Sequence, residues 1–136
     1  MADDRAFSLK IITPDRVFYE GNAIMVELRT TEGEIGVLKN HIPLTSVIAP
    51  GILRIRESDS EVKTAALISG FVEILQDSVT ILAEVVEWPD EIDVNRAEEA
   101  RVRAERRLAE KASNTNMKRA ELALERSVAR IEAAKK

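Results

Sequence analysis

The chain has 136 residues and a formal net charge of −4, a size that fits one domain or two small ones. It has no cysteine and a single histidine, which excludes disulfides, thiolate chemistry and a histidine metal cluster. No apolar run approaches the roughly 20 residues of a membrane-spanning helix, and the opening Met1-Ala2-Asp3-Asp4 is not a signal peptide. We therefore expect a soluble protein that reaches a membrane only through other proteins.

The composition changes near residue 90. All five glycines and all four prolines lie before that point. Residues 1–90 carry 8 Lys and Arg against 15 Asp and Glu, whereas residues 91–136 carry 12 against 9. This asymmetry predicts a strand-rich, acidic domain over residues 1–88 and a basic helical domain over residues 89–136, which face different partners or each other.

Short strands are predicted from Phe7 to about Val86. Ile24, Val26 and Leu28 alternate with more polar neighbours, the pattern of a strand with one buried face. Short branched runs at 52–56, 65–68 and 71–75 are separated by turn residues. Strands of this length, with glycine and proline between them, predict an all-β N-terminal domain, a flattened antiparallel β-sandwich or barrel.

This domain shows no pattern of a catalytic site. The segment Gly33-Glu34-Ile35-Gly36 is too short and too acidic for a phosphate-binding loop, and we interpret it as a tight turn between strands. His41 beside Ile42-Pro43 is interpreted as a hydrogen-bonding loop residue. We therefore predict no catalytic residue, no metal site and no catalytic cofactor, so the chain is not expected to be an enzyme.

A helical hairpin is predicted after the proline-containing segment. Asp93 is a suitable N-cap for a first helix, whose small-residue stripe includes Ala97, Ala104, Leu108 and Ala112. Ser113-Asn114-Thr115-Asn116 interrupts the pattern, and a second helix begins near Met117. Its stripe is Met117, Ala120, Leu124, Val128 and Ile131, with Ala123 and Ser127 at the edge. One stripe of small residues on each helix predicts an antiparallel hairpin of low local stability.

Arginines recur on one face of each predicted helix, at i, i+7 and i+11. Two interpretations are open. The faces are either solvated, with glutamates three or four positions away as partners, or they bind an anion such as phosphate. A nucleic-acid adaptor is disfavoured, because the helices alternate Arg with Glu and carry no aromatic residue for stacking. The two trios are Arg96, Arg103 and Arg107, and Arg119, Arg126 and Arg130.

Several separate motifs resemble those of the epsilon subunit of F-type ATP synthases, called delta in mitochondria. The likeness begins with Ile12-Thr13-Pro14-Asp15 and covers nearly the whole chain in order. Its main motif is Gly33-Glu34-Ile35-Gly36-Val37-Leu38-Lys39-Asn40-His41-Ile42-Pro43-Leu44, followed by Ser69-Gly70-Phe71-Val72-Glu73 and Val79-Thr80-Ile81-Leu82-Ala83-Glu84.

The resemblance implies a non-catalytic subunit of the central stalk, at the cytoplasmic face of the cell membrane and peripheral to it. Its sandwich would bind the gamma subunit and the c-ring, and its hairpin would inhibit ATP hydrolysis when extended toward the alpha and beta subunits. The implied c-ring contact comprises Glu32, Gly33, Glu34, His41 and Pro43.

The resemblance also implies a regulatory nucleotide. Some bacterial epsilon subunits bind ATP through Ile/Leu-Asp-x-x-Arg-Ala, which matches Ile92-Asp93-Val94-Asn95-Arg96-Ala97. ATP would favour the folded hairpin, and magnesium is not clearly required because arginines can neutralise the phosphates. Trp88-Pro89 and Val86 depart from the family pattern. The alternative to a nucleotide-binding hairpin is an epsilon subunit whose hairpin inhibits ATP hydrolysis without binding ATP. By position, Glu87, Ile92, Asp93, Arg96 and Ala97 would hold the base and sugar, and Arg103, Arg126 and Arg130 the phosphates.

Overall fold

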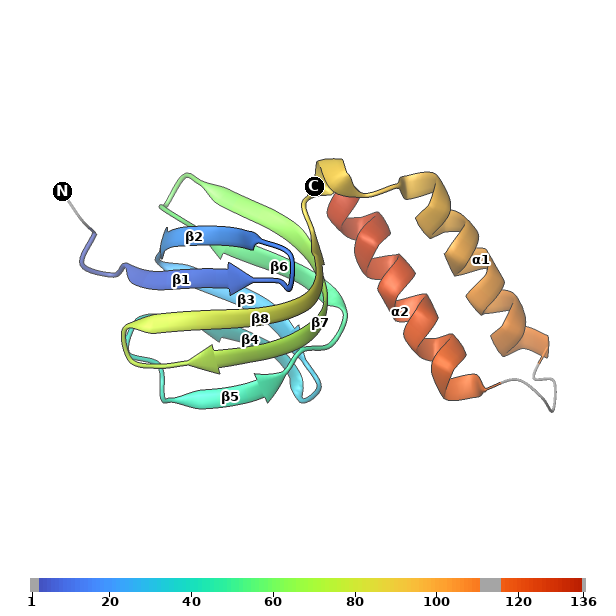
Figure 1. The fold of residues 1–136 in the computed structure, drawn as a ribbon, viewed down its shortest axis with the longest axis horizontal. Helices are drawn as coiled ribbons and strands as arrows, with labels where there is room; N and C mark the ends of the chain where they lie inside the picture. The colour runs from blue at the N-terminus through green and yellow to red at the C-terminus, as the bar shows by residue number, and fades with distance from the viewer. Residues whose placement is uncertain (1–2, 111–115, 136) are drawn as a thin grey trace.

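The structure, a computed structural model, describes residues 3–110 and 116–135. A strand-rich body is followed by two helices that lie side by side beyond one end of it (Figure 1). The predicted fold class, an all-β domain followed by a two-helix hairpin, is confirmed. The strands are β1 (Phe7–Ile12), β2 (Val17–Ala23), β3 (Met25–Thr30), β4 (Gly33–Val37), β5 (Leu44–Val47), β6 (Gly51–Arg56), β7 (Val62–Ile74) and β8 (Ser78–Glu87). The helical elements are the 3-10 turn η1 (Pro89–Glu91) and the helices α1 (Val94–Glu110) and α2 (Met117–Ala134).

The strands follow the order β2-β1-β8-β7-β6-β3-β4, and β5 pairs separately with β7. The first part of β7, through Leu67, pairs with β6, whereas residues 71–74 of the same strand pair with β5. One long strand therefore belongs to both layers of a sandwich. All strand pairs in this path are antiparallel except β1 with β8, where residues 8–12 run parallel to residues 78–82.

Strand β7 corrects one prediction. Residues 65–68 and 71–75 were expected to be separate strands, but residues 62–74 form one strand whose register with β8 shifts around Ser69 and Gly70. Gly70 has φ +138°, a conformation open to glycine and strained for other residues. The glycine therefore allows a bulge that bends the strand between the two layers, and it does not end the strand.

A second prediction is wrong at the β3–β4 connection. The segment 33–36 was expected to be a turn, but it lies within β4, and the turn consists of Thr31 and Glu32. The hydroxyl of Thr30 donates to the carbonyl of Gly33 at 2.8 Å and accepts from the N–H of Glu32 at 3.2 Å. This side chain closes the chain reversal early, and Gly33, at φ +122°, begins the next strand.

The sandwich interior is filled by branched and aromatic side chains from both layers. The predicted alternation in β3 is confirmed, because Val26 and Leu28 are buried while Arg29 is exposed. The largest fully buried side chains are Leu9, Ile11, Leu28, Leu53, Ile55, Leu67, Ile74, Ile81, Val26, Val37, Val72 and Val79.

Helix α2 lies between the sandwich and α1 (Figure 1). Ala129 and Ala133 of α2 pack with Ile52, Ala66 and Ile68 on the outer face of β6 and β7. Another face of α2, which includes Ala120 and Ser127, is also buried. The expectation of a single stripe on each helix is therefore wrong for α2, because this helix is packed on two sides. The predicted linker residues Ser113–Thr115, and Ala112, lie outside the described residues.

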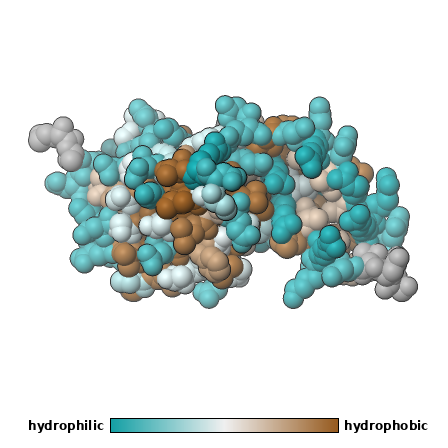
Figure 2. All heavy atoms as spheres, in the orientation of Figure 1, coloured by the Kyte–Doolittle hydropathy of each residue, from teal (hydrophilic) through white to brown (hydrophobic). Residues whose placement is uncertain are grey.

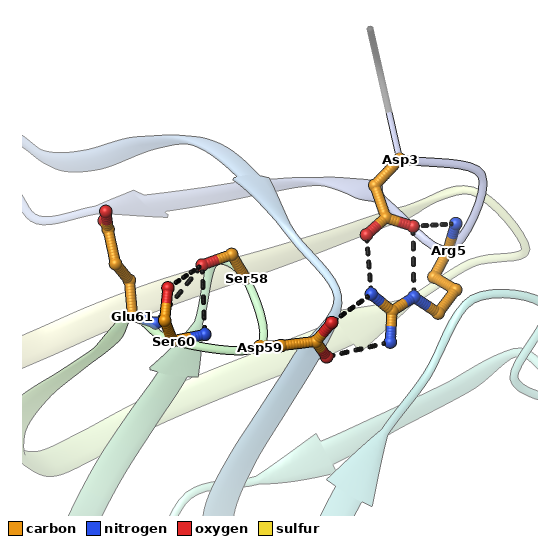
Figure 3. A network of polar contacts seen from close by, with 6 residues as sticks. All are labelled: Asp3, Arg5, Ser58, Asp59, Ser60 and Glu61. Atoms are coloured by element: carbon orange, nitrogen blue, oxygen red, sulfur yellow. Dashed lines mark hydrogen bonds and ion pairs between the residues drawn. The ribbon is translucent and has the colours of Figure 1, made fainter.

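At the opposite end of the sandwich, Arg5 joins the N-terminal segment to the β6–β7 turn (Figure 3). Its Nη2 donates to Asp3 Oδ2 at 2.7 Å, and its Nη1 donates to Asp59 Oδ1 at 3.1 Å. The hydrogen bonds from Arg5 lower the pKa of Asp3 to about 2. Because these groups are exposed, we assign them a local ordering role and no site chemistry.

Candidate functional site

The junction between η1 and α1 begins the predicted nucleotide site. Asp93 caps α1 as expected: its Oδ1 accepts from the N–H of Arg96 at 3.1 Å, and its carbonyl accepts from the N–H of Ala97 at 3.0 Å. Ile92 is buried against the sandwich and α2, and Ala97 is also buried. The local geometry of this segment is therefore set by capping and burial, with the side chain of Arg96 exposed.

Glu87 and Arg130 are the two predicted nucleotide residues that the structure places in direct side-chain contact. Arg130 Nε donates to Glu87 Oε1 at 2.7 Å. Glu87 ends β8, and Arg130 lies in the last turns of α2, so this ion pair ties the helix to the sandwich. Both side chains are about one third exposed, which leaves them accessible to a ligand.

The remaining arginines of the predicted set are solvated. Arg96, Arg103 and Arg126 are exposed, and their side chains make no hydrogen bond or ion pair within residues 3–110 and 116–135. The helix ion pairs of α1 involve a different arginine, Arg101, which bonds Glu98 and Glu105. A 370 Å³ hollow beside Arg103 is lined by Glu98, Glu99 and Val102. The guanidinium groups of Arg96, Arg103 and Arg126 are therefore available to bind an anion. Of the eight predicted nucleotide residues, the structure brings only Glu87 and Arg130 into direct side-chain contact.

The seam between the two helices consists of small side chains. Ala97 and Ala104 of α1 are buried, as is Ala120 of α2. Ser127 was expected at the edge of the seam, but it is 2% exposed, and its Oγ donates to the carbonyl of Leu124 at 2.8 Å. A hydroxyl that bonds its own helix backbone is tolerated in a buried position, which the apolar pattern alone did not indicate.

The five residues predicted to contact the c-ring lie in two places. Glu32, Gly33 and Glu34 surround the start of β4, whereas His41 and Pro43 follow its end. The three remaining residues of β4, roughly 10 Å of extended chain, separate Glu34 from the loop that carries His41 and Pro43. His41 is a loop hydrogen-bonding residue as predicted: its Nδ1–H donates to the carbonyl of Ile42 at 2.7 Å. Ile42 itself is 78% exposed.

An exposed apolar row crosses the outer face of five strands, and the sequence analysis did not identify it. Strand register joins Val47 to Phe71, Phe71 to Leu82, Leu82 to Ile12, and Ile12 to Val17. Phe71, Leu82 and Val17 are each more than half exposed. Apolar side chains gather on this side of the sandwich, over β7 and β8 (Figure 2). We call Val47, Phe71, Leu82, Ile12 and Val17 the apolar row.

The neighbouring row on the same face is polar. The next residues on this face are in register with one another, two positions along each strand and three positions along β2, where the register with β1 shifts. They are Thr45, Glu73, Thr80, Lys10 and Glu20. On this face, the apolar side chains are therefore concentrated in one row, and the neighbouring row is polar or charged. The sequence signal for the apolar row was in residues 71–75, where apolar side chains occupy both faces of the strand. A strand with one solvated face needs apolar side chains on its buried face only.

An aromatic cluster lies where β8 leaves the sandwich. The rings of Phe18 and Trp88 stack with centroids 4.2 Å apart, and Tyr19 meets Trp88 edge-on at 6.4 Å. The hydroxyl of Tyr19 donates to Glu57 Oε2 at 2.6 Å. Burial and this carboxylate raise the pKa of Tyr19 well above its ordinary value.

The raised pKa of Tyr19 predicts alkaline sensitivity of the fold. Because the pKa is higher in the folded than in the unfolded state, the contribution to stability is complete below about pH 10. It is lost as pH rises through the folded pKa. Tyr19 is the only tyrosine, so ultraviolet titration of tyrosinate reads it directly. We expect ionisation only above the pH of free tyrosine, and Tyr19→Phe should reduce the alkaline decline in unfolding free energy. A titration midpoint near pH 10 in the folded protein would contradict this.

The described part of the chain shows neither a candidate metal site nor a helix that could span a membrane. No group of three or more His, Asp or Glu residues there is placed to hold a metal ion. Among the described residues, no helix is long and apolar enough to cross a membrane.

Two family models together match almost the whole chain. Residues 6–89 match the ATP synthase delta/epsilon chain beta-sandwich domain, and residues 90–135 match the long alpha-helix domain of the same chains. The ATP synthase epsilon chain of Caldanaerobacter subterraneus subsp. tengcongensis is 46% identical over 134 residues, covering 98% of this chain and 96% of that one. The epsilon chain of Halalkalibacterium halodurans is 46% identical, covering 93% and 95%.

Two solved structures share the fold. A chain of the Euglena gracilis mitochondrial ATP synthase, in an OSCP/F1/c-ring structure, has a TM-score of 0.80 at 24% identity and covers 100% of this chain and 85% of its own length. A chain of the Tetrahymena thermophila mitochondrial ATP synthase, from a central stalk and c-ring structure, has a TM-score of 0.66 at 15% identity, with coverage of 93% and 95%.

Proposed function

The chain belongs to the ATP synthase delta/epsilon family, and from this premise we propose a specific division of labour within it. The sandwich domain, residues 1–88, binds the gamma subunit and the c-ring as a non-catalytic part of the central stalk. The hairpin domain, residues 89–136, regulates ATP hydrolysis. The protein is peripheral, at the cytoplasmic face of the membrane, and is held there by the complex.

The apolar row is the observation that carries the stalk role. One outer face of the sandwich, formed by β6 and β7, is covered by α2. The apolar row lies on another outer face and is exposed to solvent. With strands about 4.8 Å apart, five side chains in register extend roughly 19 Å. A continuous exposed strip of this kind is typical of a protein interface, and the gamma subunit is the partner that we assign to it.

The two c-ring groups fit a partner that contacts the sandwich at more than one place. Glu32 and Glu34 offer carboxylates at one end of β4, while His41, Pro43 and the exposed Ile42 offer a mixed surface at the other end. We assign both groups to the c-ring as two separate contacts rather than one. This division follows from their placement at opposite ends of the strand.

The hairpin has the properties of a regulatory element. α1 packs on α2, and α2 packs on the faces of β6 and β7. α2 contributes alanine side chains to the apolar contact with the sandwich, which also includes Ile92 before α1. The residues of α2 are Ala129, Ala133 and Ala134, and those of the strands are Ile52, Ala66, Ile68 and Val85. Such an interface buries little apolar area per residue, so the free energy that holds the hairpin on the sandwich is small. In the extended state, the basic face of the hairpin would meet the alpha and beta subunits.

ATP is the ligand that we propose for the folded hairpin. The exposed guanidinium groups of Arg103 and Arg126 are available for phosphates, and Arg130 already joins the hairpin to Glu87 of β8. A nucleotide that contacts both α2 and β8 binds the folded state and loses those contacts in the extended state. Such a difference in affinity is what a ligand needs to shift a conformational equilibrium. Magnesium is not required in this scheme, because arginines neutralise the phosphates.

The rival function is a hairpin that inhibits without a nucleotide. The observation that favours it is the ion pair itself, since Glu87 and Arg130 satisfy each other at 2.7 Å. ATP must replace or share this bond, which lowers its net affinity. Calorimetry with the isolated protein decides between the two functions.

We expect Arg126→Ala to weaken ATP binding at least tenfold, because a hydrogen bond between charged groups contributes about 1.5 kcal/mol or more. Asp93→Asn should also weaken binding, while it keeps the helix cap that Asp93→Ala would remove. The measurement is isothermal titration with ATP and with ADP, and ATP should bind more tightly.

Lys118→Ala is the matched control, since Lys118 is exposed on the same helix and belongs neither to the arginine face nor to the predicted site. Its ATP affinity should equal that of the wild type. Absence of binding heat at millimolar ATP, with the protein folded by circular dichroism, would reject the nucleotide site and support the rival function.

A further inference from the structure

The segment that leaves the sandwich, Trp88 through Glu91, is attached to β2 and the turn before it. Trp88 stacks on Phe18 of β2. Arg16, at the turn before β2, donates from Nη2 to both carboxylate oxygens of Glu91 at 2.8 Å. The guanidinium of Arg16 also lies 5.1 Å from the centre of the Phe18 ring. The Trp88–Phe18 stack and the Arg16–Glu91 ion pair thus connect residues 88–91 to the sandwich, and the Arg16–Phe18 contact holds Arg16 in place.

Glu91 also closes η1 on itself. Its Oε1 accepts from the N–H of Trp88 at 2.9 Å, and its own N–H donates to the carbonyl of Trp88 at 2.9 Å. The first bond is the glutamate half of a capping box, and the second is the ordinary backbone bond of a 3-10 turn, since the Trp88 side chain makes no cap bond. The bond from the Trp88 N–H, followed by that from Arg16, holds the pKa of the Glu91 carboxyl below its ordinary value. The carboxylate therefore joins the turn and the sandwich at one point.

The backbone changes immediately after this turn. Ile92 is extended, with φ −86° and ψ 126°, and Asp93 begins the separate capping of α1. The last backbone bond of η1 runs from the N–H of Ile92 to the carbonyl of Pro89 at 3.3 Å. No backbone bond within the described residues links residues 88–91 to α1. Residues 92 and 93 thus join two separately capped elements, and η1 also lies in contact with α2 of the folded hairpin.

We infer that Arg16 and Glu91 are positioning residues that make Trp88–Glu91 part of the sandwich, so that the hairpin pivots at Ile92–Asp93 and residues 89–91 of the hairpin domain stay with the sandwich when it moves. The regulatory meaning of this pivot rests on the proposed function. Glu87 lies on the fixed side, and Arg96 and Arg130 lie on the moving side. A nucleotide that contacts residues on both sides stabilises the folded hairpin. We call the contacts of Arg16 with Glu91 and of Trp88 with Phe18 the anchor, because they fix the position of residues 88–91 on the sandwich.

The anchor can be tested in the full-length protein by hydrogen exchange resolved for single amides. The informative amides are those of Trp88 and Glu91, and the amides of α1 provide the reference. In the wild type without ATP, we expect the two anchor amides to exchange at least about tenfold more slowly than those of α1, because the hairpin opens without η1. Arg16→Ala should accelerate exchange of the anchor amides about tenfold and change the fluorescence of Trp88, the only tryptophan.

Two further variants separate the parts of the anchor. Glu91→Gln keeps an oxygen for the N–H of Trp88 but loses the charge that pairs with Arg16, so its effect should be smaller than that of Glu91→Ala. Arg101→Ala is the control, because the ion pairs of Arg101 within the described residues are with Glu98 and Glu105 of its own helix. It should leave exchange at Trp88 and Glu91 unchanged. Equal exchange rates in wild type and Arg16→Ala would overturn the anchor.

Adding ATP distinguishes failure of the anchor from failure of the proposed function. If both hold, millimolar ATP slows exchange in α1 and α2 and leaves Trp88 and Glu91 unchanged. If ATP changes nothing while the anchor amides stay slower than α1, the anchor stands and the nucleotide site fails. If ATP slows the anchor amides and α1 together by the same factor, the pivot lies before Trp88 and the inference is wrong.

Discussion

Replacing Phe71 by aspartate is expected to weaken binding to the gamma subunit at least 100-fold without unfolding the isolated protein. Phe71 is 52% exposed and lies between Val47 and Leu82 in the apolar row. In the free protein an aspartate there remains hydrated. In the complex it would be buried opposite apolar side chains with no partner, at a cost of several kcal/mol.

The measurement is the affinity of the purified protein for a gamma subunit preparation, together with the thermal unfolding of the isolated chain. Val62→Asp is the control, since Val62 is exposed on the same strand but is not part of the apolar row. This control should bind as the wild type does. Normal binding by Phe71→Asp would show that another surface contacts gamma.

Substituting Gly70 by alanine should cost the sandwich about 3 kcal/mol or more of unfolding free energy. A Cβ at this position would lie 2.2 Å from the carbonyl oxygen of Leu82 and 2.8 Å from the Cα of Ala83. Both are backbone atoms of the paired strand, so neither can move without opening the β7–β8 ladder. The positive φ of 138° adds conformational strain.

Gly33→Ala separates these two contributions. Gly33 also has a positive φ, at 122°, but an added Cβ would meet no atom within 4 Å. This variant should therefore lose only the strain, about 1–2 kcal/mol. Urea denaturation of both variants provides the comparison. Equal losses of unfolding free energy in the two variants would mean that β8 moves to accept the new methyl group. The close approach of the β8 backbone to Gly70 would then add nothing to the strain of the positive φ.

The sequence was sufficient to predict the elements whose determinants are local. Asp93 was identified as a helix cap because the carboxylate, the following apolar spacing and the lack of helix breakers all occur within a few residues. Likewise, alternation at Val26 and Leu28 correctly predicted a strand with one buried face. These patterns depend on near neighbours, so no knowledge of the tertiary fold was needed.

The features that were missed depend on distant parts of the chain. Residues 65–75 contain a glycine that usually ends a strand, and only pairing with β5, β6 and β8 shows why the strand continues. The sequence did not reveal the second packed face of α2, because that face is defined by the contact of Ala129 and Ala133 with the sandwich. Small residues are ambiguous on a helix, because alanine suits both a seam and a solvated face.

The candidate nucleotide residues show the same limit. Helical spacing places arginines on a common face but does not say which one pairs with a distant strand. The bond between Arg130 and Glu87 joins residues 43 positions apart, while Arg126, one turn earlier, stays exposed. Pairing across elements therefore had to come from the tertiary structure.

The parallel pairing of β1 with β8 has a consequence for how the chain folds during synthesis. Ser8 is in register with Ser78, so the first strand finds this neighbour only after nearly the whole sandwich has been made. Contacts between such distant residues raise the contact order and slow folding. Until β8 emerges, the edge of β1 that faces it lacks its partner and is open to wrong pairing. The hairpin is made last, and α2 docks on β6 and β7, strands that have left the ribosome before the helices are complete.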